Sequence, residues 1–260
     1  MLLVLSPAKS LELIKPVDCS IASQPQFDTD KKPVVDMLKK MKPKKIAETF
    51  SLSEKLAALN FERYQALGSK ENVKSTRQAI FTFDGEVYLG FDAYSLDKKK
   101  FAFTQENVRI LSGLYGVLKP FDLMEPYRLE MGSKVTIGKC KNLYAFWSEK
   151  VTQSINEDLK NSSHILNLAS QEYFKVINQK TLAKPVMNFD FLELDKGELK
   201  NISFFSKKAR GLMARFVVDN KINKISDLND FDHERYSLNS KLSSDEKLVF
   251  TRKFQPIGKK

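Results

Sequence analysis

The sequence LLVLSPAK occupies residues 2–9 and decides the fold class. Its first four residues are apolar without interruption and a turn containing Pro7 follows, a pattern typical of a strand buried on both faces of a parallel or mixed sheet. The run is far shorter than the roughly 20 residues that a membrane span needs. We therefore expect residues 2–5 to form a central strand, with Ser6 and Lys9 just beyond its carboxyl end, and no membrane partner.

Strand and helix patterns alternate along the rest of the chain. HILNL at residues 164–168 predicts a second short buried strand, and residues 186–194 alternate in polarity as another strand does. Helical spacing of apolar residues covers much of residues 30–67 and returns at residues 205–221. There is no internal repeat and no Gly/Ser linker. The sequence therefore predicts one α/β domain over residues 1–260, a mixed sheet flanked by helices.

The composition is basic. Lys and Arg number 43 and Asp and Glu 32, which leaves a net charge of +11. The excess is concentrated late in the chain, because the last sixty residues hold thirteen basic and seven acidic side chains. A charge of this size favours a polyanionic partner, with a merely solubilising lysine surface as the alternative.

Cysteine and histidine are too scarce to build a site. Cys19 and Cys140 are too few and too far apart for a disulfide framework or a zinc site, and His164 and His233 stand in unlike contexts. No secretory signal precedes the first strand, so we expect a protein of the reducing cytoplasm. A Walker-type phosphate loop and a dinucleotide fingerprint are both missing. The sequence predicts no metal and no cofactor.

The helix expected near residues 205–221 carries a cationic side. Lys207, Lys208, Arg210 and Arg215 share one arc, opposite an apolar arc that can pack. Small residues such as Gly211 lie beside the charges, which predicts that a phosphate backbone can approach closely. The face therefore suits phosphate contact, although a solvated helix face is the alternative.

The motif LSGLYG forms a tight bend between Gly113 and Gly116, with Tyr115 inside it and Lys119 nearby. We expect the apolar stretch before it to be a short helix capped by Thr104. Glycines leave backbone N–H groups exposed, and such groups bind phosphate oxygens. The bend loosely resembles the hairpin of a helix-hairpin-helix DNA-binding motif, but its glycines are three residues apart rather than two. A plain structural turn is the alternative.

Two further segments bring acidic, basic and aromatic groups together. Arg128 lies in YRLE, and Glu172, Tyr173 and Lys175 lie in SQEYFK after the second buried strand. Such a set can line a pocket and perform general acid–base chemistry, although a local ion pair is the commoner explanation. Ser6 also begins a Ser-x-x-Lys sequence, but the companion motifs of the acyl-transfer enzymes that use this pair are absent.

Four of these segments together resemble one family. They are SPAK at 6–9, LSGLYGVLKPFDLMEPYRLEMG at 111–132, NLASQEYFK at 167–175 and KKARGLMARF at 207–216. Their order and their span of nearly the whole chain are similar to those of the bacterial YaaA family of peroxide-stress-response proteins. The resemblance implies a cytoplasmic protein that limits hydrogen peroxide damage, partly by keeping unincorporated iron low. It also implies a single α/β domain.

The resemblance further implies DNA binding through a basic cleft and a helix-hairpin-helix-like element. The element falls on Gly113 to Gly116 with Lys119 beside it. The cleft residues that it implies are Lys9, Lys207, Lys208, Arg210 and Arg215.

Three hypotheses follow from these observations. The first is sequence-tolerant DNA binding. The second is an enzyme that acts on a nucleobase or nucleotide in a pocket near Glu172 and Arg128. The third is an interaction protein whose charge is incidental, with partners that the sequence does not identify.

Overall fold

The structure, a computed structural model, describes residues 1–254, without the side chains of residues 73 and 74. Residues 255–260 of the expected domain lie outside the described part. One eight-stranded sheet dominates the fold, in the order β11-β12-β9-β8-β1-β5-β6 with β10 paired to β9. Its strands are β1 (Leu2–Leu5), β5 (Val108–Ser112), β6 (Gly116–Leu118), β8 (Ile165–Leu168), β9 (Val186–Asp195), β10 (Glu198–Lys200), β11 (Ser237–Leu238) and β12 (Lys247–Lys253).

The expected central strand is confirmed. β1 lies between β5 and β8 and runs parallel to both, with Leu3 opposite Val108 on one side and Leu166 on the other. All four residues of β1 are buried, as a strand covered on both faces requires. The parallel strands β1, β5, β8 and β9 therefore direct their carboxyl ends toward the same border of the sheet.

Short antiparallel strands close both lateral borders of the sheet. β6 returns along β5, with Gly116 opposite Ser112, and β11 pairs with β12 in the same antiparallel sense. Two small ribbons lie outside the main sheet. They pair β2 (Ser10–Leu11) with β4 (Phe83–Asp84), and β3 (Arg77–Gln78) with β7 (Leu123–Met124). The mixed sheet that the sequence predicted is thus confirmed.

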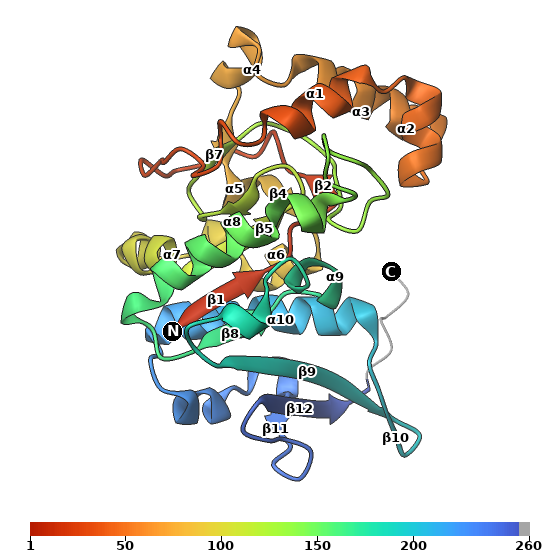
Figure 1. Cartoon of the computed structure of the whole chain (residues 1–260). Coiled ribbons are helices and arrows are strands. Elements are labelled where there is room, and N and C mark those ends of the chain that lie inside the picture. Colours follow the sequence, from red (N-terminus) through yellow and green to blue (C-terminus); the bar gives the residue numbers. More distant parts are fainter. Residues whose placement is uncertain (255–260) are drawn as a thin grey trace.

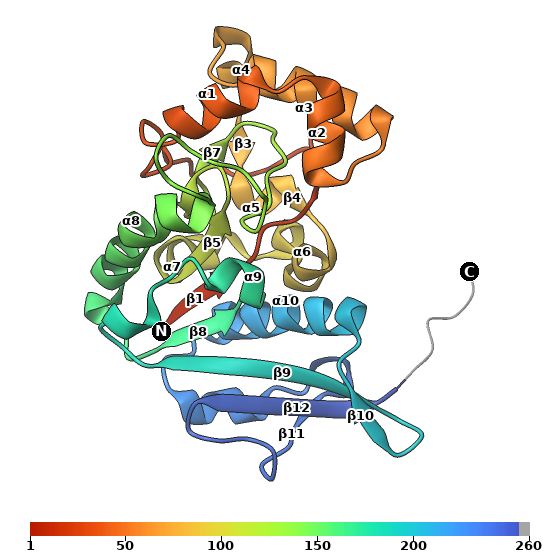
Figure 2. The ribbon, with the colours of Figure 1, turned by 45° about the vertical axis from the view of Figure 1, so that its right-hand side comes forward.

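Helices flank the sheet and form a separate layer at one end. The α-helices are α1 (Lys32–Lys40), α2 (Pro43–Phe50), α3 (Glu54–Ala66), α4 (Lys70–Lys74), α5 (Ala79–Thr82), α6 (Glu86–Phe91), α7 (Phe101–Asn107), α8 (Leu143–Asp158), α9 (Gln171–Phe174) and α10 (Ser203–Asn220). Figures 1 and 2 show α8 and α10 on opposite sides of the sheet, and α1 to α4 grouped at the end of the molecule far from β11 and β12.

Short 3-10 helices complete the connections. They are η1 (Ala93–Ser95), η2 (Lys98–Lys100), η3 (Leu159–Asn161), η4 (Gln179–Thr181), η5 (Ile225–Asp230) and η6 (His233–Arg235). The last two lie between α10 and β11 in the chain, and Phe231 between them packs edge-on against Phe191 of β9. This aromatic contact packs the segment between η5 and η6 against the sheet.

The expected helix from Thr104 toward Gly113 is wrong. Thr104 lies inside α7, which ends at Asn107, and the residues that follow form strand β5. Pairing of β5 with both β1 and β6 outweighs the local capping signal, because it buries all five residues of the strand. The helix-hairpin-helix-like element is therefore not confirmed: the bend from Gly113 joins two strands.

Candidate functional site: a cleft at the strand ends

An open cleft of about 450 Å³ lies at the carboxyl ends of β1 and β8. Open α/β sheets commonly bind ligands at this border. Five chain segments that are distant in sequence form its walls. The lining residues are Ser6 to Ser10, Asp84 to Tyr88, Glu130, Leu168, Ser170, Glu172, Tyr173, Lys207 and Arg210. We call this space the strand-end cleft.

Hydrogen bonds fix the floor of the strand-end cleft. The Ser170 backbone N–H donates to Ser6 Oγ over 2.8 Å, and the two hydroxyl oxygens lie 3.3 Å apart. The Tyr88 hydroxyl donates to the Ser6 carbonyl oxygen over 2.9 Å. Burial raises the pKa of Tyr88, which keeps this hydroxyl a neutral donor. The loops after β1 and β8 are therefore held together before any ligand arrives.

One wall of the cleft is cationic and belongs to α10. Lys207 and Arg210 are three residues apart and therefore project from the same side of the helix. Close backbone packing against α6 positions them: a β-carbon added at Gly211 would strike the Val87 carbonyl, and one at Gly90 would strike that of Lys208. The prediction that Gly211 leaves room for a phosphate backbone is thus wrong, because α6 occupies that space.

Arg210 has an unusual environment for a charged side chain. It is half-buried, and among the described residues 1–254 no hydrogen bond or ion pair to it is found. Burial lowers the pKa of its guanidinium, with Asp190 opposing the shift from a distance. Arginine remains protonated nevertheless, so the cleft contains a partly desolvated cation that no carboxylate of the described residues approaches to ion-pair distance.

Another part of the lining is acidic. The Glu130 side chain is only 15% exposed and lies 3.3 Å from Lys9 Nζ and 3.2 Å from Arg128 Nη2. Glu172 is exposed and accepts a hydrogen bond from the Gly132 N–H over 3.0 Å. The strand-end cleft thus combines carboxylates with ammonium and guanidinium groups.

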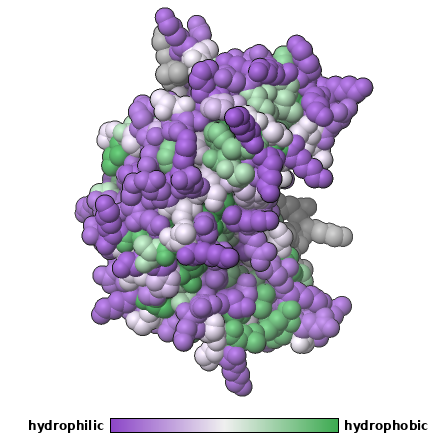
Figure 3. All heavy atoms as spheres, in the orientation of Figure 1, coloured by the Kyte–Doolittle hydropathy of each residue, from purple (hydrophilic) through white to green (hydrophobic). Residues whose placement is uncertain are grey.

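Further acidic groups border the cationic wall. Asp84 and Glu86 line the cleft near Lys207. Burial raises the pKa of Glu86, while Lys208 lowers it. Figure 3 shows hydrophilic residues spread over the whole visible face, with apolar ones scattered among them. The carboxylates of Asp84 and Glu86 therefore interrupt the positive charge of this wall.

Lys208 and Arg215 take part in interactions of their own. Lys208 Nζ lies 2.5 Å from Glu234, outside the lining of the strand-end cleft. The Arg215 guanidinium donates to Asp219 over 2.7 Å and to the carbonyls of Phe91 and Asp92 at the end of α6. Arg215 therefore binds one helix to another.

Lys119 lies apart from the other basic residues. It follows the edge strand β6, which runs antiparallel to β5 and leads the chain away from the carboxyl ends of the parallel strands. It lines a separate pocket with Arg109, Asp122 and Asp158. The structure therefore does not bring Lys119 together with Lys9, Lys207 and Arg210.

The bend between β5 and β6 is buried. Gly113 packs against the Leu129 carbonyl, and Gly116, with φ of +69°, packs against the indole ring of Trp147. Tyr115 is fully buried. Its backbone N–H donates to Ser112 Oγ rather than pointing to solvent. These residues therefore support the fold at this bend, and they present no surface to a phosphate backbone.

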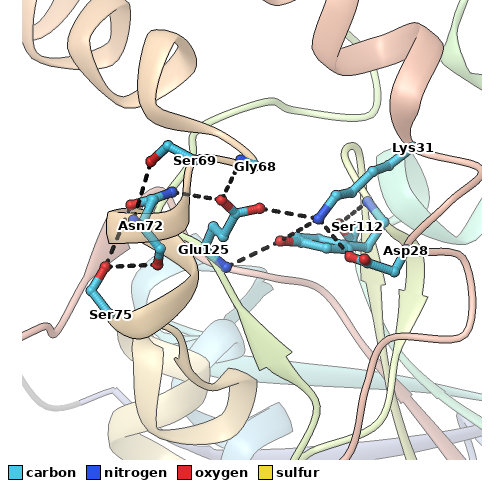
Figure 4. Close-up of polar contacts among 9 residues, drawn as sticks. Asp28, Lys31, Gly68, Ser69, Asn72, Ser75, Ser112 and Glu125 are labelled. Atoms are coloured by element: carbon cyan, nitrogen blue, oxygen red, sulfur yellow. Dashed lines mark hydrogen bonds and ion pairs between the residues drawn. The ribbon is translucent and has the colours of Figure 1, made fainter.

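Tyr115 belongs instead to a polar cluster with Lys31 and Glu125, which are labelled in Figure 4. Its hydroxyl accepts hydrogen bonds from Lys31 Nζ and from the Glu125 backbone N–H. Glu125 lies 3.1 Å from Lys31 Nζ and also accepts from the Gly68 N–H and the Asn72 amide. The cluster joins the helical layer of α1 to α4 to the sheet.

Tyr173 and Lys175 differ in exposure. Tyr173 is buried at the edge of the cleft, and burial raises its pKa. Lys175 is exposed, with its ammonium 5.5 Å from the centre of the Tyr144 ring, and does not line the cleft. Of the residues expected in a pocket, Ser6, Glu172 and Tyr173 line the strand-end cleft. Arg128 does not line it but forms an ion pair with Glu130, which does.

The sequence reasoning missed Asp84, Glu86 and Tyr88 as cleft residues. They lie in the stretch from Ala79 to Phe91, which forms α5, β4 and α6. The Asp84-Gly85 dipeptide signals a turn. No local signal shows that this turn folds back onto the loop after β1.

The described residues also limit other classes of site. Within residues 1–254, no group of three or more His, Cys, Asp or Glu side chains is arranged to hold a metal ion. No helix in that part of the chain is both long and apolar enough to cross a membrane.

Comparisons with known proteins cover nearly the whole chain. The sequence model of the family described as peroxide stress protein YaaA matches residues 1–242. The chain is 45% identical over 252 residues to a UPF0246 protein of Flavobacterium johnsoniae, covering 97% of this chain and 100% of that protein. It is 44% identical over 254 residues to a UPF0246 protein of Hahella chejuensis, covering 97% and 99%.

Proposed function

Because the chain belongs to the family of peroxide stress protein YaaA, we propose that it binds DNA through phosphate contacts and thereby limits iron-dependent oxidative damage. Its net charge of +11 supports a polyanionic partner. Such binding depends on the DNA backbone and is therefore tolerant of sequence.

The observation that carries the proposal is the unpaired guanidinium of Arg210. A half-buried cation without a counter-ion among the described residues is stabilised when an anion enters, because the anion replaces the solvent that burial removed. Arginine also binds phosphate with two parallel hydrogen bonds. Lys207 lies one helical turn away and adds a second cation on the same side.

The proposed contact set is smaller than the one expected from the sequence. Lys207 and Arg210 line the strand-end cleft without an ion pair among the described residues, while Lys9 and Lys208 become available if they leave Glu130 and Glu234. Lys119 and Arg215 are not included, since one lies in a separate pocket and the other binds α6.

A salt titration tests the proposal. With about 3 phosphates neutralised, log affinity against log salt should have a slope of roughly −3 for duplex DNA. The measurement is fluorescence anisotropy of a labelled duplex at several ionic strengths. A response that does not change with salt contradicts phosphate contact.

Matched variants locate the binding surface. Lys207→Gln and Arg210→Gln should each weaken duplex binding and reduce the slope by about 1. Lys119→Gln removes the same charge from the separate pocket and should leave both quantities unchanged. Equal effects of all three variants would show that only total charge matters.

A second candidate is an enzyme that acts on a nucleobase or nucleotide in the same cleft. Its specific support is the pair Glu130 and Glu172, since carboxylates are the usual proton donors and acceptors in such chemistry. Incubation with duplex and single-stranded DNA, followed by mass analysis of the nucleosides, tests it. Covalent change that Glu172→Gln abolishes supports the enzyme, and retention of unaltered DNA supports the binder.

A further inference from the structure

The strand-end cleft has the dimensions of a small-molecule site rather than of a duplex groove. Its volume of about 450 Å³ falls within the range of pockets that enclose small ligands. A DNA duplex is too wide to enter such a space and can touch only its border. The interior therefore requires an occupant smaller than a double helix.

The basic and the acidic residues that line the cleft bind different chemical groups of an occupant. Lys207 and Arg210 attract an anionic end, and Arg210 has no other partner among the described residues. Glu130, which is already paired with Lys9 and Arg128, and the exposed Glu172 accept hydrogen bonds from hydroxyl or amino groups. The occupant is thus anionic at one end and rich in donors at the other.

The cleft is also partly apolar. Pro7, Ala8, Val87 and Leu168 line it alongside the Tyr88 ring. Flat aromatic groups bind well to such surfaces. A nucleotide has all three features: a phosphate, a flat base, and hydroxyl and amino donors on the sugar and base.

We infer that the strand-end cleft binds a single nucleotide unit, with its phosphate at Lys207 and Arg210 and its donor groups at Glu130 and Glu172. The unit is either a free mononucleotide or an unpaired nucleotide of a DNA strand, and in the second case the inference rests on the proposed DNA binding. Enzymes that handle one base of a duplex take it out of the stack in this way.

The first arm of the test uses free ligands. Calorimetric titration compares deoxyadenosine 5′-monophosphate with deoxyadenosine and with inorganic phosphate. The nucleotide should bind at least about tenfold more tightly than either fragment, because each fragment contacts only the basic or only the acidic residues. Equal affinity for inorganic phosphate and nucleotide overturns the inference for the free ligand.

The second arm uses DNA. A duplex with one 2-aminopurine opposite an abasic site is compared with the fully paired duplex. If the cleft binds an unpaired nucleotide, the duplex with the abasic site should bind more tightly than the paired duplex, and the fluorescence of its 2-aminopurine should rise. Failure of both arms overturns the inference, while loss of paired-duplex binding alone contradicts only the proposed function.

Variants connect either result to the cleft. Arg210→Gln should weaken nucleotide binding about tenfold, and the exposed Lys207→Gln serves as a second variant with intact packing. Glu172→Gln should change the preference among the four mononucleotides. Lys119→Gln is the control with no expected effect, and if it weakens binding as much as Lys207→Gln does, the site lies elsewhere.

Discussion

The backbone N–H of Ser170 lies 2.8 Å from Ser6 Oγ, so that one serine hydroxyl joins the ends of two neighbouring parallel strands. Ser6 follows β1 directly and Ser170 precedes α9. The hydrogen bond spans 164 positions of sequence. This hydrogen bond therefore holds the loop after β1 at a fixed distance from the loop after β8.

Ser6→Ala should lower the free energy of unfolding by about 1–2 kcal/mol, since the half-buried Ser170 N–H loses its acceptor. Urea denaturation measures the change. Ser10→Ala removes an exposed hydroxyl from the same segment and should stay within about 0.5 kcal/mol of the parent protein. Equal effects of the two substitutions would contradict the role of Ser6.

Gly211→Ala should destabilise the protein by about 1–3 kcal/mol or more. Helix propensity alone favours alanine by about 1 kcal/mol. The added β-carbon would, however, strike the Val87 carbonyl, and backbone cannot yield as a flexible side chain does. Thermal and urea unfolding test the sign. A stabilised variant would show that α6 and α10 can separate at little cost, and Lys207→Ala controls for changes on the same helix.

Lys31→Met should cost about 3–5 kcal/mol, because it leaves the Glu125 carboxylate charged and 3% exposed without its ammonium partner. The neighbouring pair of Lys32 and Asp36 is exposed, so Lys32→Met should cost about 0–1 kcal/mol. Chemical denaturation of the two variants under identical conditions makes the comparison. Similar losses would mean that the buried ion pair is worth no more than a surface one.

Glu234→Gln should reduce stability at neutral pH and have less effect in acid. Burial alone raises the pKa of the Glu234 carboxyl, but hydrogen bonds from Lys208 and Arg252 outweigh it and hold the pKa below its ordinary value of 4.5. A lowered pKa stabilises the fold above the unfolded value, and this contribution disappears as pH falls through the folded value. The difference in melting temperature between parent and variant should therefore narrow below about pH 4.5.

The control for this pH dependence is Glu246→Gln, which changes an exposed carboxylate with no ion pair among the described residues. It should shift the melting temperature little at either pH. A constant difference between Glu234→Gln and the parent protein across the acid range would contradict the assignment to Glu234.

Local patterns predicted the strands that are buried by apolar residues alone. The run at 2–5 is continuous and that at 164–168 is interrupted only by the uncharged Asn167, so their buried environment can be read from composition. Strand β5 escaped prediction because Arg109 interrupts it. That guanidinium is 3% exposed and forms two hydrogen bonds of 2.5 and 2.6 Å with Asp158, 49 residues away. A charge buried by a distant partner looks like a surface residue in the sequence.

The cleft was predictable only in part, for a similar reason. Ser6, Lys9 and Glu172 follow parallel strands, and the carboxyl ends of parallel strands meet at one border. Lys119 follows a strand that runs the other way, and charge patterns do not reveal strand direction. Arg215 shares its helix arc with Lys207, but the end of α6 binds its guanidinium. Only the tertiary packing distinguishes a cation that is free from one that is already engaged.

The short strands at the two lateral borders of the sheet affect the tendency of the protein to associate with neighbouring molecules. β6 and β11 contain three and two residues, so a neighbouring molecule finds only a few unpaired backbone groups along either border. Long unprotected borders act as templates for fibril growth and self-association. A protein needed when oxidants damage its surroundings is thus shielded by its own topology from joining the aggregates that such damage produces.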